Sequence, residues 1–75
     1  MVMTLIDGHN VIRADGTVAK RVVLLSTVSM GESFQLTGSD VPGLNSDDVI
    51  AAGSVLITPD ANYIAFTDGN FGKKE

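Results

Sequence analysis

The chain has 75 residues, a formal net charge of −4 and no cysteine. This length provides for one domain with a single core, and the lack of cysteine excludes disulfides, thiolate metal sites and cysteine nucleophiles. The negative charge argues against a nucleic-acid partner, because phosphate binding rewards dense Lys and Arg. We therefore expect one small β-rich domain over residues 1–75.

The apolar content is high for so short a chain. Hydrophobic residues make up 44% of the sequence, and the mean hydropathy is positive. A domain of this size hides only about 60% of the surface that its unfolded chain exposes, so its stability is marginal without reinforcement. Because disulfides are excluded and a single histidine argues against a histidine-based metal site within one chain, the composition predicts a homo-oligomer or a subunit of a larger assembly.

The beginning of the chain predicts neither a targeting segment nor a membrane span. Residues 1–6 are apolar, but the run is far too short and Asp7 interrupts it. We expect a soluble chain with no membrane partner.

The first third of the chain reads as short strands joined by turns. Residues 2–6 (V-M-T-L-I) predict a strand, residues 7–10 (D-G-H-N) a turn, and residues 11–13 a short return. Asp15-Gly16 is a second turn signal. Residues 18–28 hold four valines and a threonine, which favour a strand over a helix.

The middle of the chain contains a short strand and a loop. Residues 33–37 (S-F-Q-L-T) alternate between apolar and polar, as in a strand with one buried face. Residues 38–43 (G-S-D-V-P-G) predict a loop, since Pro42 cannot donate to a central ladder.

Residues 46–52 carry the best helix signature in the sequence. Ser46 can cap the N-terminus, the two acids that follow complement the helix dipole, and Gly53 suits a left-handed exit. We expect at most two turns, with Val49 and Ile50 covering one end of the sheet.

The last third of the chain predicts two strands and two tight turns. Residues 54–58 and 63–67 alternate with a period of two, so each presents two distinct faces. Residues 58–62 (T-P-D-A-N) supply one reversal and Asp68-Gly69 the other. The tail, residues 72–75, is expected to fray.

These elements together predict the fold class. Aspartate recurs beside glycine at Asp7, Asp15 and Asp68, which gives a regular rhythm of turns between five or six short strands. We expect a mainly β fold, a small antiparallel meander, sandwich or barrel-like sheet, with one short helix near residues 46–52.

Residues 5–12, L-I-D-G-H-N-V-I, resemble the opening strand and loop of the NYN/PIN-like ribonucleases. The resemblance implies that Asp7 ends a strand as a carboxylate ligand for a divalent metal, with Asn10 beside it, in an alternating α/β domain about twice as long as this chain. A turn in which Asp7, Gly8 and Asn10 make local hydrogen bonds explains the same residues. We favour the turn.

Two other segments suggest a cation. Asp60-Ala61-Asn62 and Asp68-Gly69-Asn70 place oxygen donors at alternate positions, as calcium ligands would be. A twelve-residue loop ending in glutamate is missing, and turn chemistry accounts for both segments. We assign no metal or cofactor to them.

The remaining candidates for catalysis are isolated. His9 is a lone histidine in a polar stretch, and nothing marks it as part of a Ser-His-Asp arrangement. Glu32 and Asp40 are possible paired carboxylates, but they lie on connections that would not fix their separation. We therefore assign no catalytic residue.

The aromatic side chains allow two interpretations. Tyr63, Phe66 and Phe71 could form a patch for a glycan or a peptide, or they could fill the core. We favour the core, because the chain has few large side chains of this kind.

Residues 15–22 and 51–71 are rich in turns and acids, and they resemble the small β-rich modules of phage and prophage virion proteins, such as tail-fibre and capsid-associated pieces. The resemblance implies a non-enzymatic structural or interaction module that self-associates, in a virion or in the cytoplasm of a bacterial host. Two alternatives stay open. One is a metal-dependent nuclease fragment organised on Asp7, and the other is a small ligand-binding β domain that uses the loops near Asp60 and Asp68.

Overall fold

A computed structural model describes residues 3–74, so Val2 of the first predicted strand and Glu75 of the predicted tail lie outside the described residues. Within this range the chain forms seven strands in one mixed sheet and one short helical element. They are β1 (Met3–Ile12), β2 (Val18–Ser26), β3 (Ser33–Gln35), η1 (Gly38–Asp40, a 3₁₀-helix), β4 (Val49–Ile50), β5 (Val55–Ile57), β6 (Asn62–Thr67) and β7 (Asn70–Lys73). The predicted mainly β class is confirmed.

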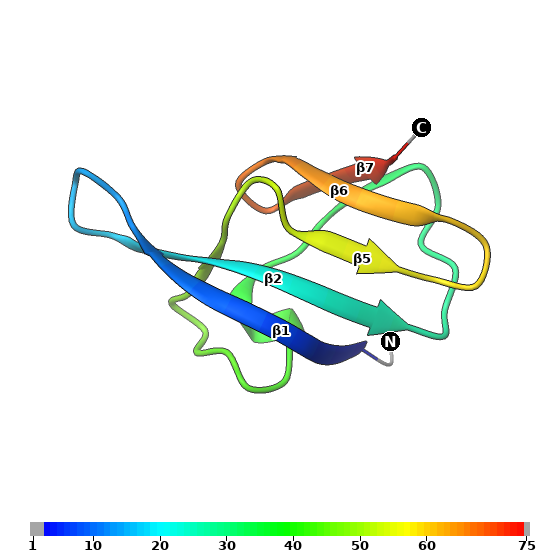
Figure 1. Cartoon of the computed structure of the whole chain (residues 1–75), viewed down its shortest axis with the longest axis horizontal. Helices are drawn as coiled ribbons and strands as arrows, with labels where there is room; N and C mark the ends of the chain where they lie inside the picture. Colours follow the sequence, from blue (N-terminus) through cyan, green and yellow to red (C-terminus); the bar gives the residue numbers. More distant parts are fainter. Residues whose placement is uncertain (1–2, 75) are drawn as a thin grey trace.

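The sheet has the order β1-β2-β5-β6-β7-β3, with β1 and β3 at its edges (Figure 1). The prediction of an antiparallel arrangement holds for four pairs, but β2 pairs in parallel with both β4 and β5. The reason is that the chain crosses over between β2 and β4 through residues 27–48, instead of turning back directly. The sheet is therefore mixed rather than a simple meander.

The β1–β2 hairpin is the longest feature of the molecule. The predicted turn at Asp15-Gly16 joins the two strands, with Gly16 at a φ of 85° and the Thr17 amide donating to Asp15 Oδ1 at 3.0 Å. The far half of the hairpin projects beyond the rest of the sheet (Figure 1), and the molecule measures 36 × 23 × 17 Å. We call residues 8–22 the arm. Its base stays in contact with the rest of the sheet, since Ala19 and Lys20 pair with β4 and Val22 is buried, and its end projects.

The prediction of a turn at residues 7–10 is wrong, because β1 runs through them. A β-bulge between Leu5 and Asp7 takes up one residue, and pairing with β2 then continues to Ile12. The long ladder to β2 satisfies the backbone groups that a turn would have left to local side chains, so tertiary pairing overrides the local turn signal. Asp7 still makes the expected local bond, since its Oδ1 accepts from the Gly8 amide at 2.9 Å.

The helix predicted at residues 46–52 is also wrong. Val49 and Ile50 form β4 instead, and the Ala51 amide donates to the Lys20 carbonyl at 2.6 Å. So short a segment cannot stand as a helix by itself, and pairing with β2 satisfies its backbone at once. Asp48, one of the two acids of the predicted helix, stabilises a turn instead: its Oδ2 accepts from the Asn45 amide at 2.8 Å.

The C-terminal hairpins are confirmed. β5 and β6 pair antiparallel, and so do β6 and β7, which are joined by a turn at Asp68-Gly69, where Gly69 has a φ of 76°. The tail differs from the prediction, since Gly72 and Lys73 belong to β7. The Lys73 amide donates to the Glu32 carbonyl, which ties the end of the chain to the sheet.

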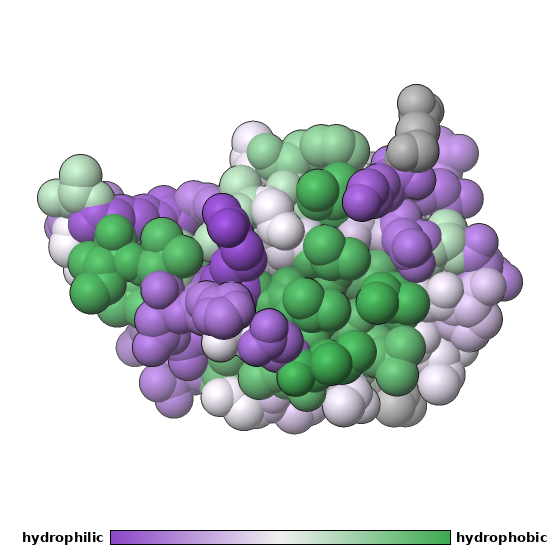
Figure 2. All heavy atoms as spheres, in the orientation of Figure 1, coloured by the Kyte–Doolittle hydropathy of each residue, from purple (hydrophilic) through white to green (hydrophobic). Residues whose placement is uncertain are grey.

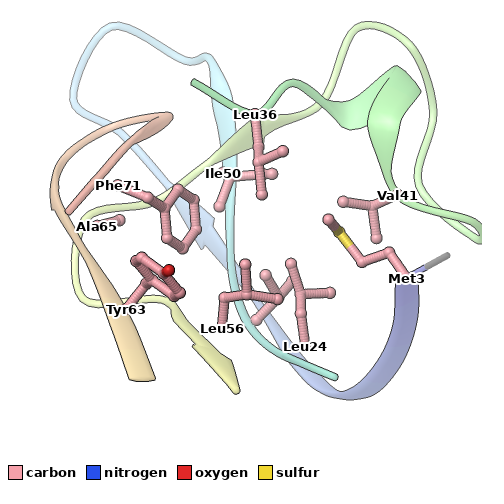
Figure 3. Packing of buried hydrophobic residues seen from close by; sticks show 10 residues of the cluster. Met3, Leu24, Leu36, Val41, Ile50, Leu56, Tyr63, Ala65 and Phe71 are labelled. Carbon is pink, nitrogen blue, oxygen red and sulfur yellow. The ribbon is translucent and has the colours of Figure 1, made fainter. Parts of the chain in front are cut away.

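The core lies on one face of the sheet. Its inner residues come from β2, β5, β6 and β7, and residues 36–50 fold across them, with Leu36 and Val41 pointing into the cluster (Figure 3). Tyr63 and Phe71 are core residues, as predicted, but the same prediction is wrong for Phe66, which is 66% exposed on the other face of β6. The Phe34 ring packs edge-on to Tyr63 at 5.1 Å. The outer face of the same strands is left without a covering layer formed by the described residues.

A buried hydroxyl joins two strands of this core. Ser54 Oγ accepts from the Val22 amide at 3.0 Å and donates to the Ala51 carbonyl at 2.7 Å. Both its donor and its acceptor capacity are used, so Ser54 is buried without an unpaired polar group.

Candidate functional site

The outer face of the sheet is built from the alternate residues of the core strands. Val23, Val55 and Ile64 lie side by side across β2, β5 and β6, and Leu25 pairs with Ile57 in the next row. Because successive strand residues point to opposite sides, the neighbours of these five residues fill the core. The first row is thus apolar on all three strands, while the row of Leu25 and Ile57 ends at Asn62 on β6.

Two bulges add large side chains to this surface. Ile6 is the extra residue of the bulge in β1, and Phe66 is the extra residue of the bulge in β6. Their exposed fractions are 55% and 66%, and that of Leu25 is 43%. We call the complete set the outer apolar face: Ile6, Val23, Leu25, Val55, Ile57, Ile64 and Phe66.

Gly72 allows Phe66 to lie flat against the sheet. A Cβ atom at Gly72 would stand 2.6 Å from Phe66 Cε2, so the ring occupies the space above the glycine. Gly72 pairs with Ile64, which makes the ring a continuation of the outer apolar face toward β7.

A polar belt borders the outer apolar face on the side of the arm. His9 pairs with Arg21, and His9 Nε2 lies 3.3 Å from Asp7 Oδ2. The belt, Asp7, His9 and Arg21, therefore carries a carboxylate and a guanidinium, and the guanidinium of Arg21 lies beside Gly53. Beyond it the arm ends in three exposed apolar side chains, Val11, Ile12 and Val18, of which Ile12 is 76% exposed. Figure 2 shows both apolar regions on one side of the molecule, with polar atoms between them.

The nuclease-like residues are not arranged as the resemblance implies. Asp7 lies in the middle of an exposed edge strand beside His9, not at the end of a strand in an alternating α/β fold. Asn10 pairs with Lys20 further along β1, and alternation points its side chain away from the side of Asp7. Within residues 3–74 there is no group of three or more His, Cys, Asp or Glu side chains placed to hold a metal ion.

The calcium-like segments hold turns. Asp68 Oδ1 accepts from the Ala52 amide at 2.8 Å, and its other oxygen forms an ion pair with Arg13. Asn70 Nδ2 donates to Thr67 Oγ1 at 2.8 Å. Asp60 accepts from the Ser29 hydroxyl, which links the β5–β6 turn to the end of β2. These carboxylates are engaged by protein donors.

Two shallow hollows lie on the surface. One of about 250 Å³ is lined by Asp48, Ile50 and Asp68 among others, and its two carboxylates pair with Lys20 and Arg13 of the arm. The other, of about 530 Å³, lies between Glu32, Phe66 and Lys73. Glu32 and Asp40 do not meet: Asp40 accepts from the Thr37 amide at 2.8 Å and caps η1.

Comparison with known proteins gives no match: no family model fits the chain, and no curated protein or solved structure is similar to it. No helix among residues 3–74 is long and apolar enough to cross a membrane. The most distinctive surface on the described residues is therefore the outer apolar face, with the arm beside it.

Sequence reasoning found the alternation that creates this surface but not the surface itself. The period of two predicts that Val55 and Ile57 share one face of their strand, and that Ile64 and Phe66 share one face of theirs. It does not predict which face of the sheet a second layer covers, since both faces carry apolar residues. The bulges, which keep Asp7 and Thr67 on the outer side after Ile6 and Phe66, left no local signal.

Proposed function

We propose that this chain is a non-enzymatic structural module that works by self-association through the outer apolar face. The observation that carries the proposal is the apolar row of Val23, Val55 and Ile64 across three strands, which a second apolar pair on β2 and β5 and large side chains at both ends extend. Contiguous apolar patches are rare on monomers and mark interaction sites when polar residues surround them.

The chemistry of the face supports a second copy as the partner. None of its seven residues carries a charge, so two identical faces can meet without like-charge repulsion. Cyclic dimers place the same patch of both subunits in contact, which requires this kind of self-compatibility. The high apolar content of a 75-residue chain supports the same conclusion, because burial against a copy completes a small core.

The likeness of residues 15–22 and 51–71 to virion modules supports the same class of function. A virion subunit must bury surface against copies of itself or against neighbouring subunits, and a sheet with one bare apolar face meets that requirement. We accordingly propose an assembly of the phage type as the setting for this self-association.

The test is the molar mass in solution. The wild-type chain, 7.8 kDa as a monomer, should show a multiple of this mass by light scattering or sedimentation between 1 and 100 μM (roughly the Kd range of moderate interfaces). Leu25→Ser/Phe66→Ser should weaken the association by about tenfold or more, since each side chain contributes about 1 kcal/mol or more on burial.

Val28→Ser is the matched control. The exposed fraction of Val28, 41%, is close to that of Leu25, 43%, but Val28 lies beyond the end of β2 and outside the strand pairs that form the face. It should leave the mass unchanged, and circular dichroism should show the same fold for all three chains. A wild-type chain that stays monomeric at about 100 μM would associate more weakly than moderate interfaces do, and this result would overturn the proposal.

A further inference from the structure

The free edge of β1 is a feature that the outer apolar face does not explain. Among the described residues β1 pairs only with β2, so its other edge lies open (Figure 1). The second edge strand, β3, has three residues, whereas β1 has ten, and every residue of β1 from Ile6 onward is exposed. Natural sheets shield open edges with short strands, bulges, lysine or proline. The bulge in β1 lies before Asp7, and residues 8–12 (G-H-N-V-I) hold no lysine or proline.

The hydrogen bonds of β2 show which of its backbone groups turn away from β1. The Lys20 carbonyl accepts from the Ala51 amide at 2.6 Å, and the Val22 amide donates to Ser54 Oγ at 3.0 Å. The backbone groups of successive strand residues point to opposite edges of the strand. The even-numbered residues of β2 therefore bond toward β4 and β5, and the odd-numbered residues bond toward β1.

Strand pairing transfers this alternation to β1. In an antiparallel pair, two residues that lie opposite each other either bond to each other or both point away. Gly8, Asn10 and Ile12 lie opposite even-numbered residues of β2, so their amides and carbonyls point to the free edge. The Arg13 amide, one position further on, donates to the Thr17 carbonyl at 2.9 Å, as the alternation requires. The edge thus presents backbone donors and acceptors at three positions that are evenly spaced about Asn10.

We propose that this edge pairs antiparallel with the same edge of a second copy, about a two-fold axis at Asn10. Asn10 then lies opposite Asn10 of the other copy, and Gly8 of each copy lies opposite Ile12 of the other. Each of these pairs is of the kind that exchanges two hydrogen bonds, because the backbone groups of all three residues face the edge. The bulge lies outside the paired stretch, so the register stays regular throughout it.

The side chains fit the same register. Ile12 is the most exposed large apolar side chain of the described residues, at 76%, and in the pair it lies opposite a residue without a side chain. A Cβ atom at Gly8 would stand 3.4 Å from Val22 Cγ1 and 3.6 Å from Leu5 Cδ1, so apolar groups border the space that Ile12 of the other copy enters. Residues 8–12 contain no Asp, Glu, Lys or Arg, so no like charges meet at the axis.

The edge contact and the outer apolar face use different groups. A two-fold axis perpendicular to the sheet keeps the outer faces of both copies on one side, and neither face takes part in the edge contact. A chain that makes both contacts forms an assembly larger than a dimer. The inference therefore extends the proposed self-association and holds or fails separately from it.

Amide hydrogen exchange of the wild-type chain tests the pairing. In the monomer the Asn10 and Ile12 amides should exchange fast, whereas the Val11 amide, which bonds to β2, should exchange slowly. Association should protect Asn10 and Ile12 as well. The Gly8 amide is a poorer probe, because Asp7 Oδ1 accepts from it within the chain at 2.9 Å. Association that leaves Asn10 and Ile12 fast overturns the proposal, and so does protection that appears only when a different protein is added.

Charges placed at the axis test the register. Asn10→Lys and Asn10→Asp should each weaken the edge contact by about fivefold or more, because like charges then face each other. A mixture of the two variants should restore the contact, since opposite charges then meet. The matched control is Val18→Lys, at a 40% exposed position on the other strand of the arm, and it should leave the contact unchanged. A mixture that associates no better than either variant alone overturns the axis at Asn10.

The charge variants are measured in the Leu25→Ser/Phe66→Ser chain, where the outer apolar face no longer contributes. This chain should remain a dimer by light scattering, and Asn10→Lys should dissociate it. A monomeric Leu25→Ser/Phe66→Ser chain would overturn edge pairing and leave association through the outer apolar face intact. A mass equal to that of the wild-type chain, lost on Asn10→Lys, would support edge pairing and remove the proposed face contact.

Discussion

Leu24 and Leu25 are neighbours in β2 with opposite surroundings. Leu24 is fully buried in the core cluster, whereas Leu25 is 43% exposed on the outer apolar face. The two residues have the same side chain, so the pleat of the strand alone decides which one stabilises the monomer and which one is free to contact a partner.

We predict that Leu24→Ala lowers the free energy of unfolding by about 2–5 kcal/mol, because it leaves a cavity in a packed core. Leu25→Ala should cost less than about 1 kcal/mol when measured at a concentration where the chain is monomeric. Urea denaturation of the two variants at matched dilution checks the contrast. Equal losses would show that the assignment of the two faces is wrong.

Asp48 is a residue whose ionisation is tied to a contact between distant segments of the fold. The side-chain hydrogen bond from Lys20, assisted by the Asn45 amide, lowers the pKa of the Asp48 carboxyl below its usual value. A carboxyl whose pKa is lower in the folded chain than in the unfolded chain stabilises the fold above its unfolded pKa, near 4, and this contribution is lost as the pH falls through the folded value.

We therefore predict that Asp48→Asn lowers the melting temperature at pH 7 and flattens its decline in acid. The wild-type and variant curves should converge below the folded pKa of Asp48, where the wild-type carboxyl is also neutral. Melting followed by circular dichroism from pH 7 downward measures this. The exposed neighbour variant Asp47→Asn is the control, and an equal effect from it would contradict the assignment to the Lys20 contact.

At the scale of elements, the segment of residues 36–50 decides which face of the sheet is closed. It crosses the inner face at η1, and Gly38 is its tightest point. The Gly38 amide donates to the Asp48 carbonyl at 3.2 Å. A Cβ atom at Gly38 would stand 2.8 Å from that carbonyl oxygen and would also collide with the carbonyl oxygen of Asn45.

We predict that Gly38→Ala costs about 1–3 kcal/mol or more, because backbone atoms on two sides must move to admit the methyl group. Gly8→Ala is the matched control, since a Cβ atom there would lie 3.4 Å from Val22 Cγ1, near ordinary contact. Thermal unfolding of both variants tests the difference. A Gly38→Ala chain as stable as wild type would mean that this crossing is looser than described.

The two bulges act at the same scale. Alternation with the inward-facing Leu5 and Ala65 already places Ile6 and Phe66 on the outer side. Each bulge inserts one residue opposite its partner strand and so keeps the following residue, Asp7 or Thr67, on the outer side as well. The outer apolar face therefore ends in polar residues at both bulges.

At the scale of the whole molecule, the described residues cover only one of the two faces of the sheet with a second layer. Residues 36–50 supply that layer, and the crossover that carries them also makes the sheet mixed. The opposite side keeps an apolar surface and a projecting arm. For so small a domain these are the surfaces through which additional burial can come, and that is why self-association is the function we propose.

The sequence by itself determined the mainly β class, a long strand within residues 18–28, both C-terminal hairpins and the glycine turns at Gly16 and Gly69. These follow from period-two alternation and from local backbone preferences, which act between near neighbours. The same local rules predicted a turn at residues 7–10 and a helix at residues 46–52, and both predictions were wrong. In both places pairing with β2 satisfied the backbone better than the local option.

Only the tertiary structure decided which apolar face is buried. Val55 and Ile57 on one side of β5 look as suitable for a core as Leu56 between Ser54 and Thr58 on the other. Which face is buried depends on where a distant segment crosses the sheet. It also depends on the hydrogen bond that the Val22 amide donates to the Ser54 hydroxyl, 32 positions away in the sequence. Contacts over such separations leave no periodic trace in the sequence, because they are set by the path of the chain and not by its local pattern.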